Sequence, residues 1–186
     1  MAHCRGLISP PRRWRRLCRE EIGRVFEIDR REVIERIYEV RAGELVSHDE
    51  FYDMAGWPPG EPEQALPWLV ASFDRGAQFV GVFDGDRLVG VAAVDTVLIG
   101  PRDDLVQLSF LHVGRDQRDQ GLGTALFEEA SRIARGLGAR GLYVSATPSE
   151  HTVRFYLARG CRVIAEPDPD LFAREPEDVH FECRFD

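Results

Sequence analysis

The chain contains no lysine and no asparagine, so all 24 residues of the lysine and arginine class are arginines. It has no apolar run of the about 18 residues that a membrane-spanning helix needs. Its four cysteines are scattered without a Cys-x-x-Cys pair, and no two histidines stand at ligand spacing. A membrane span and a structural zinc site are therefore both disfavoured, and Cys161 is expected to be a small buried apolar residue.

Length and charge predict one acidic domain that follows a basic N-terminal arm. A chain of 186 residues can bury about 70% of its unfolded surface, which is enough for one core. The first twenty residues hold six arginines and one acidic residue, whereas the remainder holds 18 arginines and 31 acidic residues. The start also lacks the continuous apolar core of a secretory signal. We expect a flexible arm over 1–20, a domain over 21–186 and a cytoplasmic location.

The excess of acidic residues in the expected domain, 21–186, indicates which partners it attracts. Non-specific nucleic-acid binding needs a basic face, which such a body lacks. A cationic amine is attracted instead. The basic arm alone could still touch nucleic acid or an anionic surface, and this alternative stays open.

Hydrophobic spacing and turn signals predict strands that alternate with helices. Strands are expected at 21–28, 78–83, 87–98, 105–113, 140–146, 161–165 and 179–185. Helices are expected at 29–41, 61–75, 122–137 and 149–159, and a long loop at 44–60. Together they describe one α/β domain without repeats.

The most informative stretch joins the strand at 105–113 to the helix at 122–137. It reads Arg118-Asp119-Gln120-Gly121-Leu122-Gly123-Thr124. Two glycines let the backbone approach a ligand, and free N–H groups at a helix start favour an anion. No third glycine and no Gly-Lys-Ser/Thr follows, so neither a dinucleotide motif nor a Walker loop fits. These residues alone leave a phosphate site and a plain packing turn equally open.

Three motifs in order resemble the GNAT superfamily of acyl-CoA-dependent N-acyltransferases, over roughly 79–163. They are Leu111-His112-Val113 before Arg118-x-x-Gly121-x-Gly123, the strand from Gly141 to Ala146, and Phe155-Tyr156 followed by Gly160-Cys161. The resemblance implies a single-domain GNAT-like α/β fold with a mixed, mostly antiparallel twisted sheet flanked by helices. It also implies acetyl transfer from acetyl-CoA, without a metal, to a primary amine of a small molecule or peptide, in a protein that can form a homodimer.

The resemblance further assigns roles to residues of the site. It places the coenzyme A diphosphate on the amides of Arg118, Asp119, Gln120, Gly121, Leu122, Gly123 and Thr124. Backbone groups of Leu111 and Val113 would pair with the pantetheine arm and the acyl carbonyl. Tyr156 would bond the cofactor sulfur and protonate it as it leaves, which a phenol of pKa about 10 can do. Ser149 stands where the family often has asparagine, so its hydroxyl would reach the cofactor instead.

The general base cannot be assigned from the sequence. Gln107 and Ser109 occupy the strand face where the family often has Glu or His, and neither is a base at neutral pH. The opposite strand parity of His112 predicts that it faces the other side of the sheet. A water chain or a carboxylate from elsewhere stays open, with Asp95, Glu32 and Asp53 as candidates.

The resemblance implies that acceptor recognition lies in the first two helices and the segment between them. Aromatic and acidic residues of this region could form a pocket for an amine, namely Tyr38, Phe51, Tyr52, Trp57, Glu44, Asp49, Glu50 and Asp53. A loop pinned to the core by its aromatics would use the same residues. The missing strand carboxylate also permits a second class of function, a non-catalytic acyl-CoA-binding regulatory module.

Overall fold

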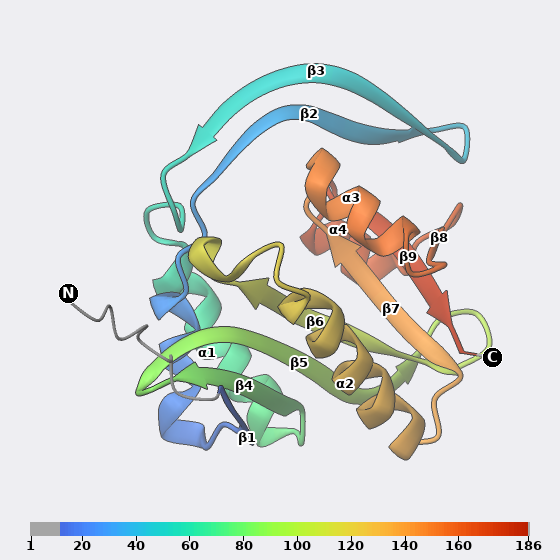
Figure 1. Cartoon of the computed structure of the whole chain (residues 1–186). Coiled ribbons are helices and arrows are strands. Elements are labelled where there is room, and N and C mark those ends of the chain that lie inside the picture. Colours follow the sequence, from blue (N-terminus) through green and yellow to red (C-terminus); the bar gives the residue numbers. More distant parts are fainter. Residues whose placement is uncertain (1–11, 186) are drawn as a thin grey trace, which may run out of the picture.

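The computed structural model describes residues 12–185, and its centre is one seven-stranded sheet (Figure 1). The strand order is β1-β4-β5-β6-β7-β9-β8. The strands are β1 (Arg13–Arg16), β4 (Gln78–Asp84), β5 (Arg87–Ile99), β6 (Leu105–Val113), β7 (Gly141–Ala146), β8 (Arg162–Val163) and β9 (Val179–Arg184). All neighbours are antiparallel except β6 and β7. The expected α/β domain with a mixed, mostly antiparallel sheet is confirmed.

Helices cover both faces of this sheet. They are α1 (Glu61–Asp74), α2 (Leu122–Gly136), α3 (Glu150–Leu157) and α4 (Pro169–Arg174), with 3-10 helices η1 (Arg19–Glu27) and η2 (Arg115–Gln117). The core under α2 and α3 contains Leu126 and Phe181, and the core under η1 and α1 contains Ile22 and Leu69. Alternate residues of β4 and β5 enter the two cores, so these lie on opposite faces. No helix within residues 12–185 is long and apolar enough to cross a membrane.

Local sequence explains both ends of α2. Its apolar residues recur every three or four positions, and Leu126, Ala130 and Ile133 are buried on one face. The helix begins after Gly121 (φ 77°) and is followed by Gly138 (φ 83°), two positions in the left-handed region that favours glycine.

The expected first strand at 21–28 is wrong, because this segment forms η1. Ile22, Val25 and Ile28 recur every three residues, which is the period of a 3-10 helix. All three side chains are buried. The period of three, rather than two, therefore decides which residues enter the core.

The expected helix at 29–41 and loop at 44–60 are also wrong. They form a two-stranded hairpin, β2 (Glu32–Arg41) and β3 (Glu44–Met54). Ala42 and Gly43, both at positive φ, make the two-residue turn between them. Four of the ten residues of β2 are β-branched, which favours an extended chain: Val33, Ile34, Ile37 and Val40. Figure 1 shows the hairpin arching over the body above α3.

Residues 13–20 of the expected flexible arm belong to the folded domain. Arg13–Arg16 pair with β4, and Leu17 is buried. Charged partners on the body lie beside Arg13 (Asp86, 3.6 Å), Arg15 (Glu21, 2.6 Å) and Arg19 (Asp74, 2.7 Å). Three arginines of the expected arm are thus paired with carboxylates of the body. The rest of the expected arm, residues 1–11, lies outside the described residues.

Cys161 is buried, as expected, but it is not a free thiol. It forms a disulfide with Cys183 of β9, with the two Cα atoms 4.2 Å apart. The bond ties the segment after α3 to the central sheet. The cytoplasmic location stays a prediction.

Candidate active site

A cleft opens where β6 and β7 separate. The two strands pair in parallel only from Leu105 to Gln107, opposite Gly141 to Tyr143. Beyond this point β6 continues along β5 and β7 along β9, so the edges of β6 and β7 that faced each other become free. A cavity of about 630 Å³ occupies the gap and is lined by side chains from both faces of the sheet.

One wall of the cleft is the head of α2. The residues expected to contact the cofactor that line the cavity are Leu111, Val113, Arg118, Asp119, Gly121, Gly123 and Thr124. The first helical hydrogen bond is donated by the Ala125 amide to the Gly121 carbonyl (3.0 Å), so the amides of 122–124 have no partner within the helix. Free amides at the positive end of a helix dipole suit an anion.

Two of the expected contacts do not line the cavity. The side chain of Leu122 is buried in the core. The side chain of Gln120 bonds to Arg12 and donates to the Asp116 carbonyl (3.0 Å). The contacts of these two residues with the cofactor stay a prediction.

Arg118 and Ser149 are engaged with protein groups beside the cleft. Arg118 Nη1 lies 3.4 Å from a Glu32 carboxylate oxygen, and its Nε donates to the Val113 carbonyl (3.3 Å). The other Glu32 oxygen accepts from Ser149 Oγ (3.4 Å). Ser149 Oγ also accepts the Thr152 amide and so caps α3. The structure therefore gives Ser149 a capping role, and its expected contact with the cofactor stays a prediction.

Arg159 is a cleft residue that the sequence did not single out. Its Nη2 donates to Thr124 Oγ1, and its guanidinium carbon lies 3.4 Å from the centre of the Phe155 ring. Its Nε is buried without a partner in the described chain. Burial lowers its pKa, but a guanidinium stays charged in proteins. An arginine at the end of a helix is too common to signal this position beforehand.

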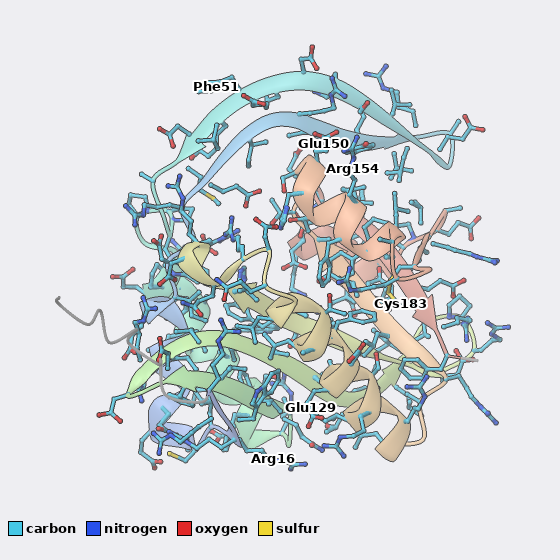
Figure 2. All side chains as sticks on the ribbon, viewed as in Figure 1. Arg16, Phe51, Glu129, Glu150, Arg154 and Cys183 are labelled. Carbon is cyan, nitrogen blue, oxygen red and sulfur yellow. A yellow bond between two sulfur atoms is a disulfide. The ribbon has the colours of Figure 1, made fainter. Side chains whose placement is uncertain are left out.

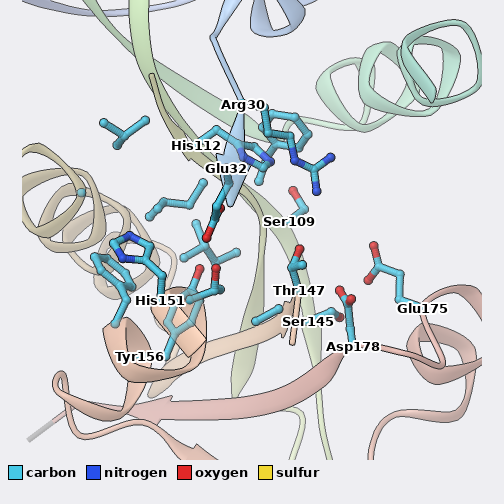
Figure 3. A pocket seen from close by; sticks show the side chains of 18 of the residues that line it. Arg30, Glu32, Ser109, His112, Ser145, Thr147, His151, Tyr156, Glu175 and Asp178 are labelled. Carbon is cyan, nitrogen blue, oxygen red and sulfur yellow. The ribbon is translucent and has the colours of Figure 1, made fainter. Parts of the chain in front are cut away.

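Tyr156 lies on the same side of the sheet as α2, with its hydroxyl at the cavity (Figure 3). Its ring packs against Phe127, Phe155 and Phe181 and is only 5% exposed. Burial raises the pKa of the phenol above its ordinary value. The hydroxyl therefore stays protonated across the neutral range.

The opposite wall is aromatic and charged. Arg30 pairs with Glu61 (2.9 Å) and lies 4.8 Å from the centre of the Trp57 ring. Trp57 stacks on Phe110 and contacts His112 edge-on, with ring centres 5.8 and 5.0 Å apart. Trp57 thus supports this wall from behind, although it does not line the cavity itself.

The expected orientation of His112 is wrong because β6 carries a bulge. Ala93 pairs with Phe110 and Val94 with Leu108, which leaves Ser109 unpaired. The alternation shifts there, so His112 shares a face with Gln107 and lines the cleft. Burial and the charges of Arg30 and Arg118 lower its pKa to about 3. His112 is therefore neutral and a very weak base.

The carboxylates expected as bases are dispersed. Asp95 is buried away from the cavity and accepts from Ser72 Oγ (3.2 Å). Asp53 lies on the exposed β3 strand, and Glu32 lines the cleft but is paired with Arg118. Asp178, which the sequence did not indicate, lines the cavity just before β9. Burial, with a contribution from Glu175, raises the pKa of Asp178 to about 7.

Most of the expected acceptor pocket is not part of this cleft. Phe51 is 74% exposed and lines a separate hollow with Asp49 and Glu50. Figure 2 shows Phe51 on the arched hairpin at the top of the view. Tyr38 packs against the core under α3. The expectation failed because the segment extends as a hairpin rather than folding back as a loop.

Known proteins share this architecture. Nourseothricin acetyltransferase aligns with a TM-score of 0.63 and 15% identity, over 92% of this chain and 98% of that one. A proposed streptothricin acetyltransferase of Bacillus anthracis, in complex with acetyl coenzyme A, gives 0.68 and 12%, over 94% and 100%. PaiA N-acetyltransferase of Thermoplasma acidophilum, in complex with coenzyme A, gives 0.61 and 17%, over 95% and 100%. At these identities the likeness is one of fold.

The sequence itself carries the family signature. No curated protein sequence matches the chain significantly. The profile of the Acetyltransferase (GNAT) family matches residues 35–161, which include the β6–α2 turn and the Tyr156 helix. The chain belongs to the GNAT family of acetyltransferases, whose acetyl donor is acetyl-CoA.

Proposed function

We propose that the chain acetylates a primary amine of a small cationic molecule or a peptide. The observation that carries this proposal is a cleft that passes between β6 and β7. Free helix amides line one end, the Tyr156 hydroxyl lies along it, and a carboxylate-rich wall closes the other end.

The cofactor half of the cleft, formed by the head of α2 and the free edge of β6, carries groups that suit acetyl-CoA. Amides of residues 122–124, with Arg159 beside them, would hold the diphosphate. The main chain of Leu111 and Val113 lies on the edge of β6 that β7 has left, where it would pair with the pantetheine arm. Bound acetyl-CoA supplies an activated thioester.

Tyr156 would act as the general acid. Its ring is fixed by aromatic neighbours, and its hydroxyl forms no hydrogen bond with any described residue, so it is available to a ligand. Its raised pKa keeps the hydroxyl protonated at neutral pH, so a proton is present when the thiolate leaves.

The acceptor half favours a cation. Arg30 is balanced by Glu61 and Arg118 by Glu32. The lining segment 174–178 then contributes Arg174 against three carboxylates, Glu175, Glu177 and Asp178. The remaining negative charge attracts a protonated amine.

Thiol release from acetyl-CoA tests the proposal. The acceptors are 1,4-diaminobutane, streptothricin and a peptide with a free N-terminal alanine. Tyr156→Phe should lower kcat by about 10²- to 10⁴-fold, the usual contribution of a general acid, with little change in acetyl-CoA affinity. Tyr52→Phe makes the same change on the exposed hairpin and should behave as wild type. Tight acetyl-CoA binding without thiol release on any amine would instead favour the non-catalytic module.

A further inference from the structure

The two ends of the cleft lie on opposite faces of the sheet. Tyr156 projects from the face that α2 and α3 cover. On β7, Val144 and Ala146 enter that same core, so Ser145 points to the other face. The amine must therefore be activated from the face opposite the acid.

Few groups on that face can accept a proton. Ser109 and Gln107 are not bases, and His112 is too weak a base because of its low pKa. Glu61 is held by Arg30 at 2.9 Å. The three carboxylates of the lining segment, Glu175, Glu177 and Asp178, take part in none of the ion pairs formed within residues 12–185. Glu175 and Glu177 are exposed, whereas Asp178 is partly buried.

Asp178 is held in place by its backbone and by a buried network. Its amide donates to the Glu175 carbonyl (3.2 Å), and the next residue, Val179, pairs with Ala146. His180, on the same face of β9, contacts the Tyr143 hydroxyl (2.8 Å) and the Glu175 carbonyl (3.2 Å). The segment that carries Asp178 is thus fixed at both ends.

The close-up view shows what Asp178 faces. Its carboxylate lies beside Ser145 and Thr147 on one side of the pocket, with Tyr156 on the other side (Figure 3). Ser145 Oγ is buried without a hydrogen-bond partner in the described chain. An unpaired carboxylate and an unsatisfied hydroxyl at one point of the cavity suit an ammonium group.

We infer that Asp178 is the general base of the acetyl transfer, a role that rests on the proposed function. The Asp178 carboxylate takes one proton from the acceptor ammonium. The nitrogen lone pair forms a bond to the thioester carbon while the carbon–sulfur bond breaks. Tyr156 gives its proton to the sulfur and regains one from the acylated nitrogen, and Asp178 releases its proton to water. One proton is therefore released for each amide formed.

The charge environment matches this role. Burial and the neighbouring charge of Glu175 raise the pKa of Asp178 to about 7, while Arg30 opposes the rise. The charge of Asp178 in turn contributes to the raised pKa of Tyr156, as expected for two groups of one cleft. A base titrating near the working pH is available and still accepts a proton effectively.

The test compares Asp178→Asn with Asp170→Asn, the same change on α4 outside the cavity. In the thiol-release assay with 1,4-diaminobutane, streptothricin and the alanine peptide, Asp178→Asn should lower kcat by about 100-fold and remove the acidic limb of kcat/KM near pH 7. Asp170→Asn should keep the wild-type kcat and the acidic limb of kcat/KM. Glu175→Gln removes a neighbouring negative charge, so it should move that limb to lower pH.

Thermal unfolding gives a readout that needs no turnover. Ionising a carboxyl whose pKa is raised above the about 3.9 of an unfolded aspartate disfavours the folded state. The contribution of Asp178 to wild-type stability should therefore decrease from about pH 4 to about pH 7 and then level off. The Tm of Asp178→Asn relative to wild type should accordingly rise between pH 5 and pH 8.

The outcomes separate the two proposals. If wild type releases thiol but Asp178→Asn does so equally well, or keeps the acidic limb, the assignment of Asp178 is overturned and the proposed function stands. If wild type releases no thiol with any of the three amines, the proposed function fails and Asp178 loses its role with it. The inference is supported if Asp178→Asn loses both turnover and the acidic limb of kcat/KM while Asp170→Asn keeps them.

Discussion

The two halves of the cleft differ in how they are built from the sequence. The cofactor half comes from β6, the α2 head and α3, which follow one another in the chain with only η2 and β7 between them. The acceptor half joins Arg30, Glu61 and the loop at 175–178, which are far apart in the chain. A local motif thus fixes one half, whereas long-range packing must assemble the other. The halves should consequently fail separately when they are mutated.

Gly123→Leu should have the largest effect, and only on the cofactor half. A Cβ at this position would lie 3.1 Å from the Phe155 ring, so a larger side chain must displace that ring or enter the cavity. We expect acetyl-CoA affinity, measured by calorimetry, to fall by about 100-fold, in line with an overpacking cost of about 1–3 kcal/mol.

Gly136→Leu is the matched control on the same helix, because a Cβ there meets no atom within 4 Å. It should bind acetyl-CoA like wild type. Equal affinity in a folded Gly123→Leu protein would contradict the position given to the diphosphate.

Tyr143→Phe should act on the acceptor half. The Tyr143 hydroxyl accepts the Asp168 amide (3.1 Å) and contacts His180 Nδ1 (2.8 Å), so its loss leaves buried groups unsatisfied. We expect the free energy of unfolding to fall by about 1–3 kcal/mol. KM for the amine should rise while acetyl-CoA affinity stays unchanged. An equal loss of both affinities would show that the halves are not independent.

Phe51→Ala should have the smallest effect. The side chain is 74% exposed on the hairpin, and the hollow it lines is separate from the cleft. We expect kcat, KM and Tm close to the wild-type values, since exposed substitutions usually change stability by less than about 0.5 kcal/mol. A large rise in KM for the amine would instead show that the hairpin aromatics take part in binding the acceptor.

The same contrast explains what the sequence could predict. The strands at 78–83 and 87–98, the β6 strand and the α2 helix were predicted because turn residues and apolar spacing specify them locally. The residues expected to contact the cofactor line the cleft, apart from Gln120 and Leu122. Their contacts with the cofactor stay a prediction.

The failures lie where packing overrides local pattern. Residues of β2 have a spacing that fits a helix, and their strand pairing depends on β3 and on contact with the Pro148 carbonyl. The bulge at Ser109 reverses the face of His112 and has no signal in a single sequence. Asp178 gains its raised pKa mainly from burial, which only the folded chain produces, although Glu175, which adds to it, is close in the sequence.

A structure with acetyl-CoA bound tests the central claim most directly. We predict the diphosphate on the amides of residues 122–124, and the sulfur within about 3.5 Å of the Tyr156 hydroxyl, close to hydrogen-bond reach. A diphosphate bound elsewhere, or a Tyr156 hydroxyl turned away from the sulfur, would contradict the account.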